Sequence, residues 1–130
     1  MATLTTHVLD SLSGTHAAGL GVTLYRIEPA GGRTALFNAV TDAGGRLHKT
    51  VEVNAAHTGA TCELVFQTAD YFARQSALPG VVTAHPGILR EAALRFVMPD
   101  PDGAYHIPMM LAPSSVSVWC SSSSSSSSSS

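Results

Sequence analysis

The distribution of apolar residues is the feature that most constrains the fold of this chain. Short apolar or alternating runs recur along it and are separated by residues that favour turns, as in Asp42-Ala43-Gly44-Gly45. Several short runs of this kind at regular spacing are typical of an all-β sandwich. We therefore predict strands over Thr3–Leu9, Val22–Ile27, Leu36–Val40, Leu47–Val53, Cys62–Phe66, Leu94–Met98, Tyr105–Leu111 and Val116–Trp119.

Three segments depart from this β pattern. Asp70–Ala77 is predicted to form one short helix with Thr68 as its N-terminal cap. The connection over residues 78–92 contains two prolines and supports no prediction of structure. Serines 121–130 have no apolar side chains to bury, so we expect them to be disordered. The chain is thus expected to hold one domain over residues 1–119 and a low-complexity serine tail over residues 120–130.

Composition and charge exclude several classes of partner. The net charge is −2, and the seven Lys and Arg residues are scattered, so nothing indicates binding to nucleic acid or to an acidic membrane. No secretory leader and no long apolar segment is evident. Charged residues make up only 12% of the chain, which favours a surface partly covered by other subunits.

Cysteine usage indicates the compartment. Cys62 and Cys120 are too few and too far apart for a disulfide framework, which favours a reducing environment and a cytoplasmic location. A peroxisomal location is the alternative, although the chain has no SKL-type C-terminal signal.

Two histidines fall on the outer faces of predicted strands. Alternate side chains of a strand point to opposite faces, so His7 faces outward if Leu4 and Val8 face the core. In the run Tyr105–Leu111 the same alternation places His106 outward. Each histidine taken alone is also compatible with a hydrogen-bonded structural residue.

The other residues on the predicted face of His106 are apolar, namely Pro108, Met110 and Ala112. Proline cannot donate a ladder hydrogen bond, which favours an edge or an irregular position for Pro108. An apolar outer face that includes a histidine indicates an interface.

Four motifs together carry a family resemblance. The stretches LTTHVLD, TDAGGR at 41–46, ELVFQTADYF at 63–72 and DPDGAYHIPMMLAP at 100–113 resemble the 5-hydroxyisourate hydrolases, which are related to transthyretin. The resemblance extends over residues 4–113. It implies a transthyretin-like (prealbumin-like) β-sandwich with one short helix, assembled as a homotetramer with active sites in channels between subunits.

The resemblance also implies a reaction. Its substrate is 5-hydroxyisourate, whose lactam is hydrolysed to 2-oxo-4-hydroxy-4-carboxy-5-ureidoimidazoline during urate degradation in purine catabolism. The family's catalytic and substrate-binding positions correspond to His7, Arg46 and His106. No metal and no organic cofactor is implied.

These residue types suit amide hydrolysis. A neutral imidazole can take a proton from water, so either His7 or His106 could be the general base. The planar guanidinium of Arg46 suits an oxyanion and urate-like carbonyls, although a solvated turn residue is the alternative for this arginine. His16, His48, His57 and His85 show no spacing typical of a metal site.

The C-terminus departs from the family, whose members usually end in tyrosine-arginine-glycine-serine. Trp119, Cys120, Ser121 and Ser122 stand there instead. Ser122 is then the candidate for a substrate-binding hydroxyl. Three interpretations follow: a hydrolase of reduced efficiency, a tail that results from a faulty gene model or a frame change, or a domain that binds without turnover. Cys120 as a nucleophile is a less favoured fourth.

Two functions from other classes remain alternatives. A transthyretin-like carrier would use the same channel, in which two histidines and Arg46 favour a polar, planar ligand over an apolar hormone. A sandwich that acts only as an assembly module would also fit the low content of charged residues.

Overall fold

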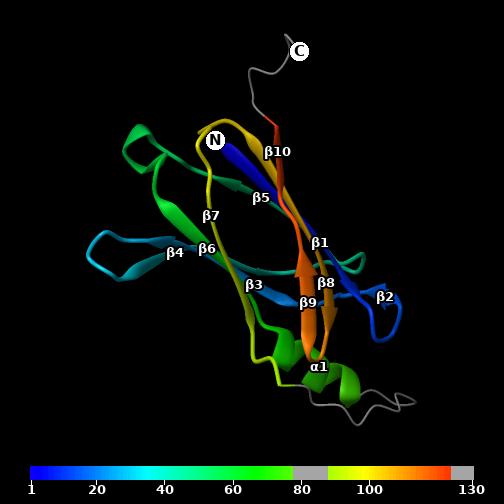
Figure 1. Cartoon of the computed structure of the whole chain (residues 1–130). Coiled ribbons are helices and arrows are strands. Elements are labelled where there is room, and N and C mark those ends of the chain that lie inside the picture. The colour runs from blue at the N-terminus through cyan, green and yellow to red at the C-terminus, as the bar shows by residue number, and fades with distance from the viewer. Residues whose placement is uncertain (78–87, 124–130) are drawn as a thin grey trace.

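Two β-sheets packed face to face form the core of the molecule, as the computed structural model in Figure 1 shows for the described residues 1–77 and 88–123. The first sheet contains β1 (Ala2–Asp10), β2 (Thr15–His16), β5 (Arg46–Val51), β8 (Ala104–Ala112), β9 (Ser115–Val118) and β10 (Ser121–Ser123). The second contains β3 (Gly21–Ile27), β4 (Arg33–Val40), β6 (Thr61–Phe66) and β7 (Ala92–Val97). With the short helix α1 (Thr68–Ser76) and the 3₁₀ turn η1 (Ala55–His57), this confirms the predicted all-β sandwich.

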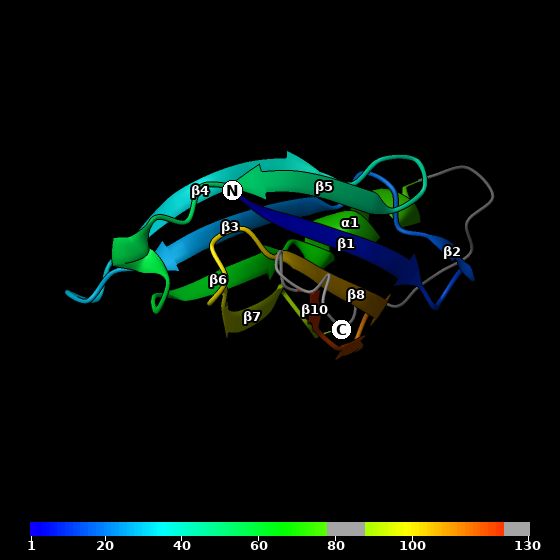
Figure 2. The ribbon, with the colours of Figure 1, turned by 90° about the horizontal axis from the view of Figure 1, so that it is seen from above.

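Strands β1 and β8 form the centre of the first sheet and run parallel to each other. The other edge of β1 pairs first with β5 and then, at Leu9 and Asp10, with β2. The other edge of β8 pairs with β10 along its first half and with β9 along its second. Figure 2 shows the resulting order β5, β1, β8, β10 across this sheet. Residues from the two ends of the chain therefore lie side by side.

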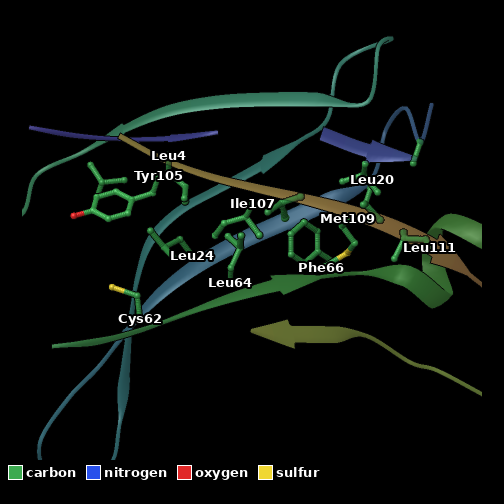
Figure 3. Packing of buried hydrophobic residues seen from close by; sticks show 14 of the residues in the cluster. Leu4, Leu20, Leu24, Cys62, Leu64, Phe66, Tyr105, Ile107, Met109 and Leu111 are labelled. Carbon is green, nitrogen blue, oxygen red and sulfur yellow. The ribbon is translucent and has the colours of Figure 1, made fainter. Parts of the chain in front are cut away.

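Side-chain alternation on β1 and β8 separates a core face from an outer face. The even-numbered residues of β1 are buried and the odd-numbered ones are not, whereas on β8 the odd-numbered residues are buried. The buried residues of β8, among them Ile107 and Met109, pack against Leu64 and Phe66 of the second sheet (Figure 3). The outward placement predicted for His7 and His106 is thereby confirmed.

Pro108 occupies an irregular position within a central strand. Trp119 donates its backbone N–H to the Pro108 carbonyl at 3.4 Å, and the pairing of β8 changes there from β10 to β9. A strand residue directs its nitrogen and oxygen to the same edge, so a return hydrogen bond from residue 108 would be expected at this point. Proline cannot make that bond, which explains why the ladder is interrupted at this residue.

The structure differs from the predictions at the helix and at the tail. The residue that precedes α1 is Gln67, which makes no side-chain capping bond, and Thr68 is already the first helical residue, so the prediction of a Thr68 cap is wrong. Ser121–Ser123 form β10, because the edge of β8 offers backbone groups that any residue with an N–H can pair with. The expectation of disorder is therefore wrong for these three serines, and residues 124–130 lie outside the described residues. The connection over residues 78–92 supported no prediction, and its residues 78–87 also lie outside the described residues.

Candidate functional site

The outer face of the first sheet brings three predicted site residues together. His7 on β1 lies directly opposite Arg46, the first residue of β5. Two residues back along β1, Thr5 lies between His48 on β5 and His106 on β8. Directly opposed residues have Cβ atoms about 4.5–5.5 Å apart, and diagonal neighbours are roughly 7–8 Å apart. The three predicted residues thus occupy neighbouring positions on one face of the sheet.

A tight turn determines where Arg46 stands. The Asp42 carboxylate accepts hydrogen bonds from the backbone N–H groups of Gly44 at 2.9 Å and Arg46 at 3.0 Å. Gly45 has a positive φ of 71°, and a Cβ added there would lie 2.5 Å from the carbonyl oxygen of Val8. Only glycine fits this conformation and this close approach without strain. The hydrogen bonds from Arg46 and Gly44 hold the pKa of Asp42 below its ordinary value, so this acceptor stays ionised.

His7 is surrounded by positive or potentially positive groups. Partial burial and the Arg46 charge lower its pKa from 6.5, and His16 and His106 act in the same direction. A hydrogen bond to the backbone of Gly44 opposes these effects. The Nε2 atom of His7 lies 3.0 Å from Nδ1 of His16, and the two ring centroids are 5.1 Å apart. His7 is consequently a neutral imidazole at physiological pH.

The ring of His106 is held by Thr5. The Thr5 hydroxyl lies 2.8 Å from Nδ1 of His106 and 3.4 Å from the carbonyl oxygen of Tyr105. Since this hydroxyl has one proton, donation to the carbonyl requires Nδ1 of His106 to be the protonated nitrogen. In that arrangement Nε2 keeps its lone pair, as a general base requires.

A pocket of about 360 Å³ opens on this face, with residues of β1, β5 and β8 in its walls. This volume lies within the range of small-molecule sites. Its walls are made by Thr5, Thr6, Asp42, Arg46, Leu47, His48 and His106. Arg46 is its cationic side chain, and His48 and His106 add imidazoles, so the pocket suits a polar, planar and acidic ligand.

The structure does not bring Ser122 to this face. Ser121 lies opposite His106, whereas Ser122 lies opposite Tyr105, whose side chain is 7% exposed and belongs to the core. Opposed residues share a face, so the hydroxyl beside His106 is that of Ser121. Ser121 and Ser122 both line a different pocket with Phe96 and Tyr105. Trp119 is 58% exposed.

Three residues of the site escaped the sequence interpretation. Thr5 and His48 each stand two positions from a predicted site residue on the same strand, so strand alternation was the signal that could have found them. His16 gave no such signal, because the two-residue strand β2 pairs with β1 through a turn that sequence patterns do not reveal.

The remaining histidines and the described helices add little to the site. His57 lines a separate pocket with Arg26 and Glu28, and His85 lies outside the described residues. In residues 1–77 and 88–123, no group of three or more His, Cys, Asp or Glu side chains is arranged to hold a metal ion. Within the same ranges, no helix has the length and apolar character needed to cross a membrane.

Comparisons with known proteins agree with the fold and the motifs. A family model described as the HIUase/Transthyretin family matches residues 4–120. The chain is 39% identical over 116 residues to 5-hydroxyisourate hydrolase 2 of Rhizobium meliloti, covering 89% of this chain and 92% of that protein. The solved structure of Klebsiella pneumoniae 5-hydroxyisourate hydrolase superimposes with a TM-score of 0.70 at 30% identity, covering 93% of this chain and 99% of that one. Transthyretin from Sparus aurata superimposes with a TM-score of 0.74 at 24% identity, covering 93% and 97%, a likeness of fold alone.

Proposed function

The chain belongs to the HIUase/Transthyretin family. From this premise we propose that it hydrolyses 5-hydroxyisourate at the outer face of the first sheet. His7, Arg46 and His106 are the residues proposed to act on the substrate. The product is 2-oxo-4-hydroxy-4-carboxy-5-ureidoimidazoline, in the degradation of urate. The names of its relatives support the hydrolase over the carrier, since the proteins 39% and 37% identical to it are 5-hydroxyisourate hydrolases.

His106 is the proposed general base. When the Thr5 hydroxyl donates to the Tyr105 carbonyl, Nδ1 of His106 donates to Thr5 at 2.8 Å, and Nε2 is available to take a proton from water. The hydroxide adds to the lactam carbonyl and forms a tetrahedral oxyanion. The carbon–nitrogen bond then breaks, the nitrogen leaves with the proton held by the imidazolium, and a carboxylic acid remains that ionises at neutral pH.

Arg46 is the proposed electrostatic partner. Its guanidinium stays charged at all relevant pH values and presents several N–H donors in one plane, which suits an oxyanion flanked by urate-like carbonyls. Its backbone is fixed by the Asp42 turn, so little reorganisation is needed when charge develops on the substrate. The observation that carries the proposal is the presence of Arg46 and His106 in the walls of one pocket.

The proposed assembly is a homotetramer that encloses this face. Met110 points outward from β8 and is 42% exposed on the single chain, although it is apolar. Covering this side chain would remove apolar surface from water and would enclose the site, which strengthens its electrostatic interactions. The molar mass measured by light scattering on a sizing column tests this assembly. Cys62 and Cys120 are both unpaired, which supports the cytoplasm as the proposed compartment.

A coupled assay tests the activity. Urate oxidase generates 5-hydroxyisourate, whose ultraviolet absorbance is followed with and without the protein. We expect a faster decay with the chain, and H106A should lower the catalysed rate by about 10²- to 10⁴-fold. H57A is the matched control, because His57 lies in a separate pocket and should leave the rate unchanged. Unchanged decay with the unmodified chain, together with calorimetric binding of urate, would favour the carrier instead.

A further inference from the structure

The position of His16 relative to the pocket suggests a role that the proposed reaction does not assign. On the outer face of β1, Thr5, His7 and Leu9 follow one another at intervals of about 6.6–7 Å. Thr5 lies opposite His48 and His106, whereas Leu9 lies opposite His16. His7 therefore stands between the pocket and His16.

The hydrogen bond of His7 is directed to the side of His16. Its Nε2 lies 3.0 Å from Nδ1 of His16. The pocket walls include Thr5, Arg46 and His106 from the neighbouring positions. His7 is not among the described residues that form these walls. In this conformation the Nε2 atom of His7 is thus bound to His16 and not directed into the pocket.

The contact between the two rings occupies Nε2 of His7. At 3.0 Å, one of the two nitrogens donates a proton and the other accepts it, and the direction depends on the tautomers of the two rings. In either direction, a substrate group or a water molecule that binds Nε2 must displace His16.

Moving His16 away from His7 costs free energy, because hydrogen bonds of the neighbouring backbone hold His16 in place. Its neighbour Ala17 donates to the Val8 carbonyl at 2.9 Å. The turn that leads to β2 is held by the buried Asp10 carboxylate, which accepts from the backbone of Leu12 and Ser13 and from the Tyr71 hydroxyl. The Cβ of His16 also lies against Gly45.

We propose that His16 is a positioning residue that competes with the substrate for Nε2 of His7. Substrate binding then requires that the His7–His16 hydrogen bond is broken and replaced by one between His7 and the substrate. A stronger His7–His16 bond therefore lowers the apparent affinity for the substrate. The inference rests on the proposed hydrolysis for its kinetic consequence, but the hydrogen bond itself can be tested without turnover.

The kinetic test compares two variants at His16. H16A removes the competing ring nitrogen, and we expect KM for 5-hydroxyisourate to fall about two- to tenfold, the equivalent of one net hydrogen bond, while kcat changes little. H16N keeps an N–H near the place of Nδ1, so its KM should remain close to that of the unmodified chain. His16 is exposed, so both variants should fold, and thermal melting checks this.

A spectroscopic test separates this inference from the proposed function. The ¹⁵N resonance of His7 Nε2 should move toward that of an unbonded imidazole nitrogen in H16A and stay in place in H16N. The neighbouring groups that also act on His7, namely Arg46, His106 and Asp42, are unchanged in both variants. An unmoved resonance in H16A overturns the inference, as does a lower kcat at unchanged KM. If the unmodified chain does not hydrolyse 5-hydroxyisourate but the resonance moves as expected, the proposed function fails and the competition for Nε2 stands.

Discussion

His7 on β1 faces Arg46 on β5 in the same row of the ladder, so an imidazole and a guanidinium share one row of the outer face. The two residues are held there by different devices. His7 is placed by strand alternation alone, whereas Arg46 depends on a turn with an Asp42 acceptor and a glycine at positive φ. The chemistry of the site therefore depends on a loop as well as on the sheet.

Replacing Arg46 should weaken catalysis more than binding. R46M removes both the charge and the donors, and we expect kcat to fall about 10²- to 10³-fold, the usual effect of losing one oxyanion donor. R46K should recover part of this loss, since an ammonium keeps the charge without the planar fork. R95K is the matched control, because Arg95 pairs with Glu63 on the second sheet. An R46M variant with full kcat would remove this side chain from the mechanism.

Thr5 should matter through its hydroxyl. T5V keeps the shape of the side chain but removes the group that holds Nδ1 of His106, so we expect kcat to fall by about two- to tenfold. T5S keeps the hydroxyl and should retain most of the rate. Steady-state kinetics of the two variants decide the matter, and equal rates in both would show that the hydroxyl does not position the ring.

The serine tract offers a test of register. Ser121 lies opposite His106 and Ser122 lies opposite Tyr105, so only the first hydroxyl shares the face of the site. We expect S121A to raise KM for 5-hydroxyisourate and S122A to leave it unchanged, as measured in the coupled assay. The reverse result would mean that the strand pairs one residue out of this register, since a shift of one exchanges the two faces.

Gly45 and Gly44 form a matched pair for the turn. G45A forces a side chain into the left-handed region and against the Val8 carbonyl, so we expect a loss of at least about 1–2 kcal/mol in the free energy of unfolding. In G44A the new Cβ lies 3.4 Å from the Asp42 carboxylate, an ordinary contact, and the loss should be small. Urea denaturation monitored by tryptophan fluorescence compares the two, and equal losses would contradict the role assigned to Gly45.

The pKa of His7 should be measurable and sensitive to Arg46. Partial burial and the Arg46 charge lower it below 6.5, so an NMR titration should show a midpoint below that value, and R46M should raise it. The unfolded chain binds this proton more readily than the folded one, so the stability contributed by His7 decreases as the pH falls through the ordinary value toward the lowered one. A midpoint at or above 6.5 in the unmodified chain would contradict this account.

Strand alternation predicted more of the site than any motif did. Turn signals and period-two runs were enough for the sandwich, and the same period placed His7 and His106 outward. The family resemblance supplied Arg46, and the register of β1 and β5 then brought its backbone opposite His7. These parts were accessible because they depend on local pattern.

The parts that escaped prediction depend on pairing between distant segments. A serine tract has no apolar pattern, so its strand is visible only once the edge of β8 is known. His16 reaches His7 through a turn held by Asp10 and Tyr71, residues 61 positions apart. The absence of a Thr68 cap follows from the way the chain enters α1, which residue preferences alone did not indicate.

The parallel pairing of β1 with β8 bears on how the protein matures. Thr5 and His106 are 101 positions apart and yet touch, so the pocket cannot exist until almost the whole domain has emerged from the ribosome. Contacts of such long range close late and slowly during folding. A nascent chain halted before β8 would carry His7 and Arg46 but no His106, and the first appearance of activity during translation would mark the closure of the first sheet.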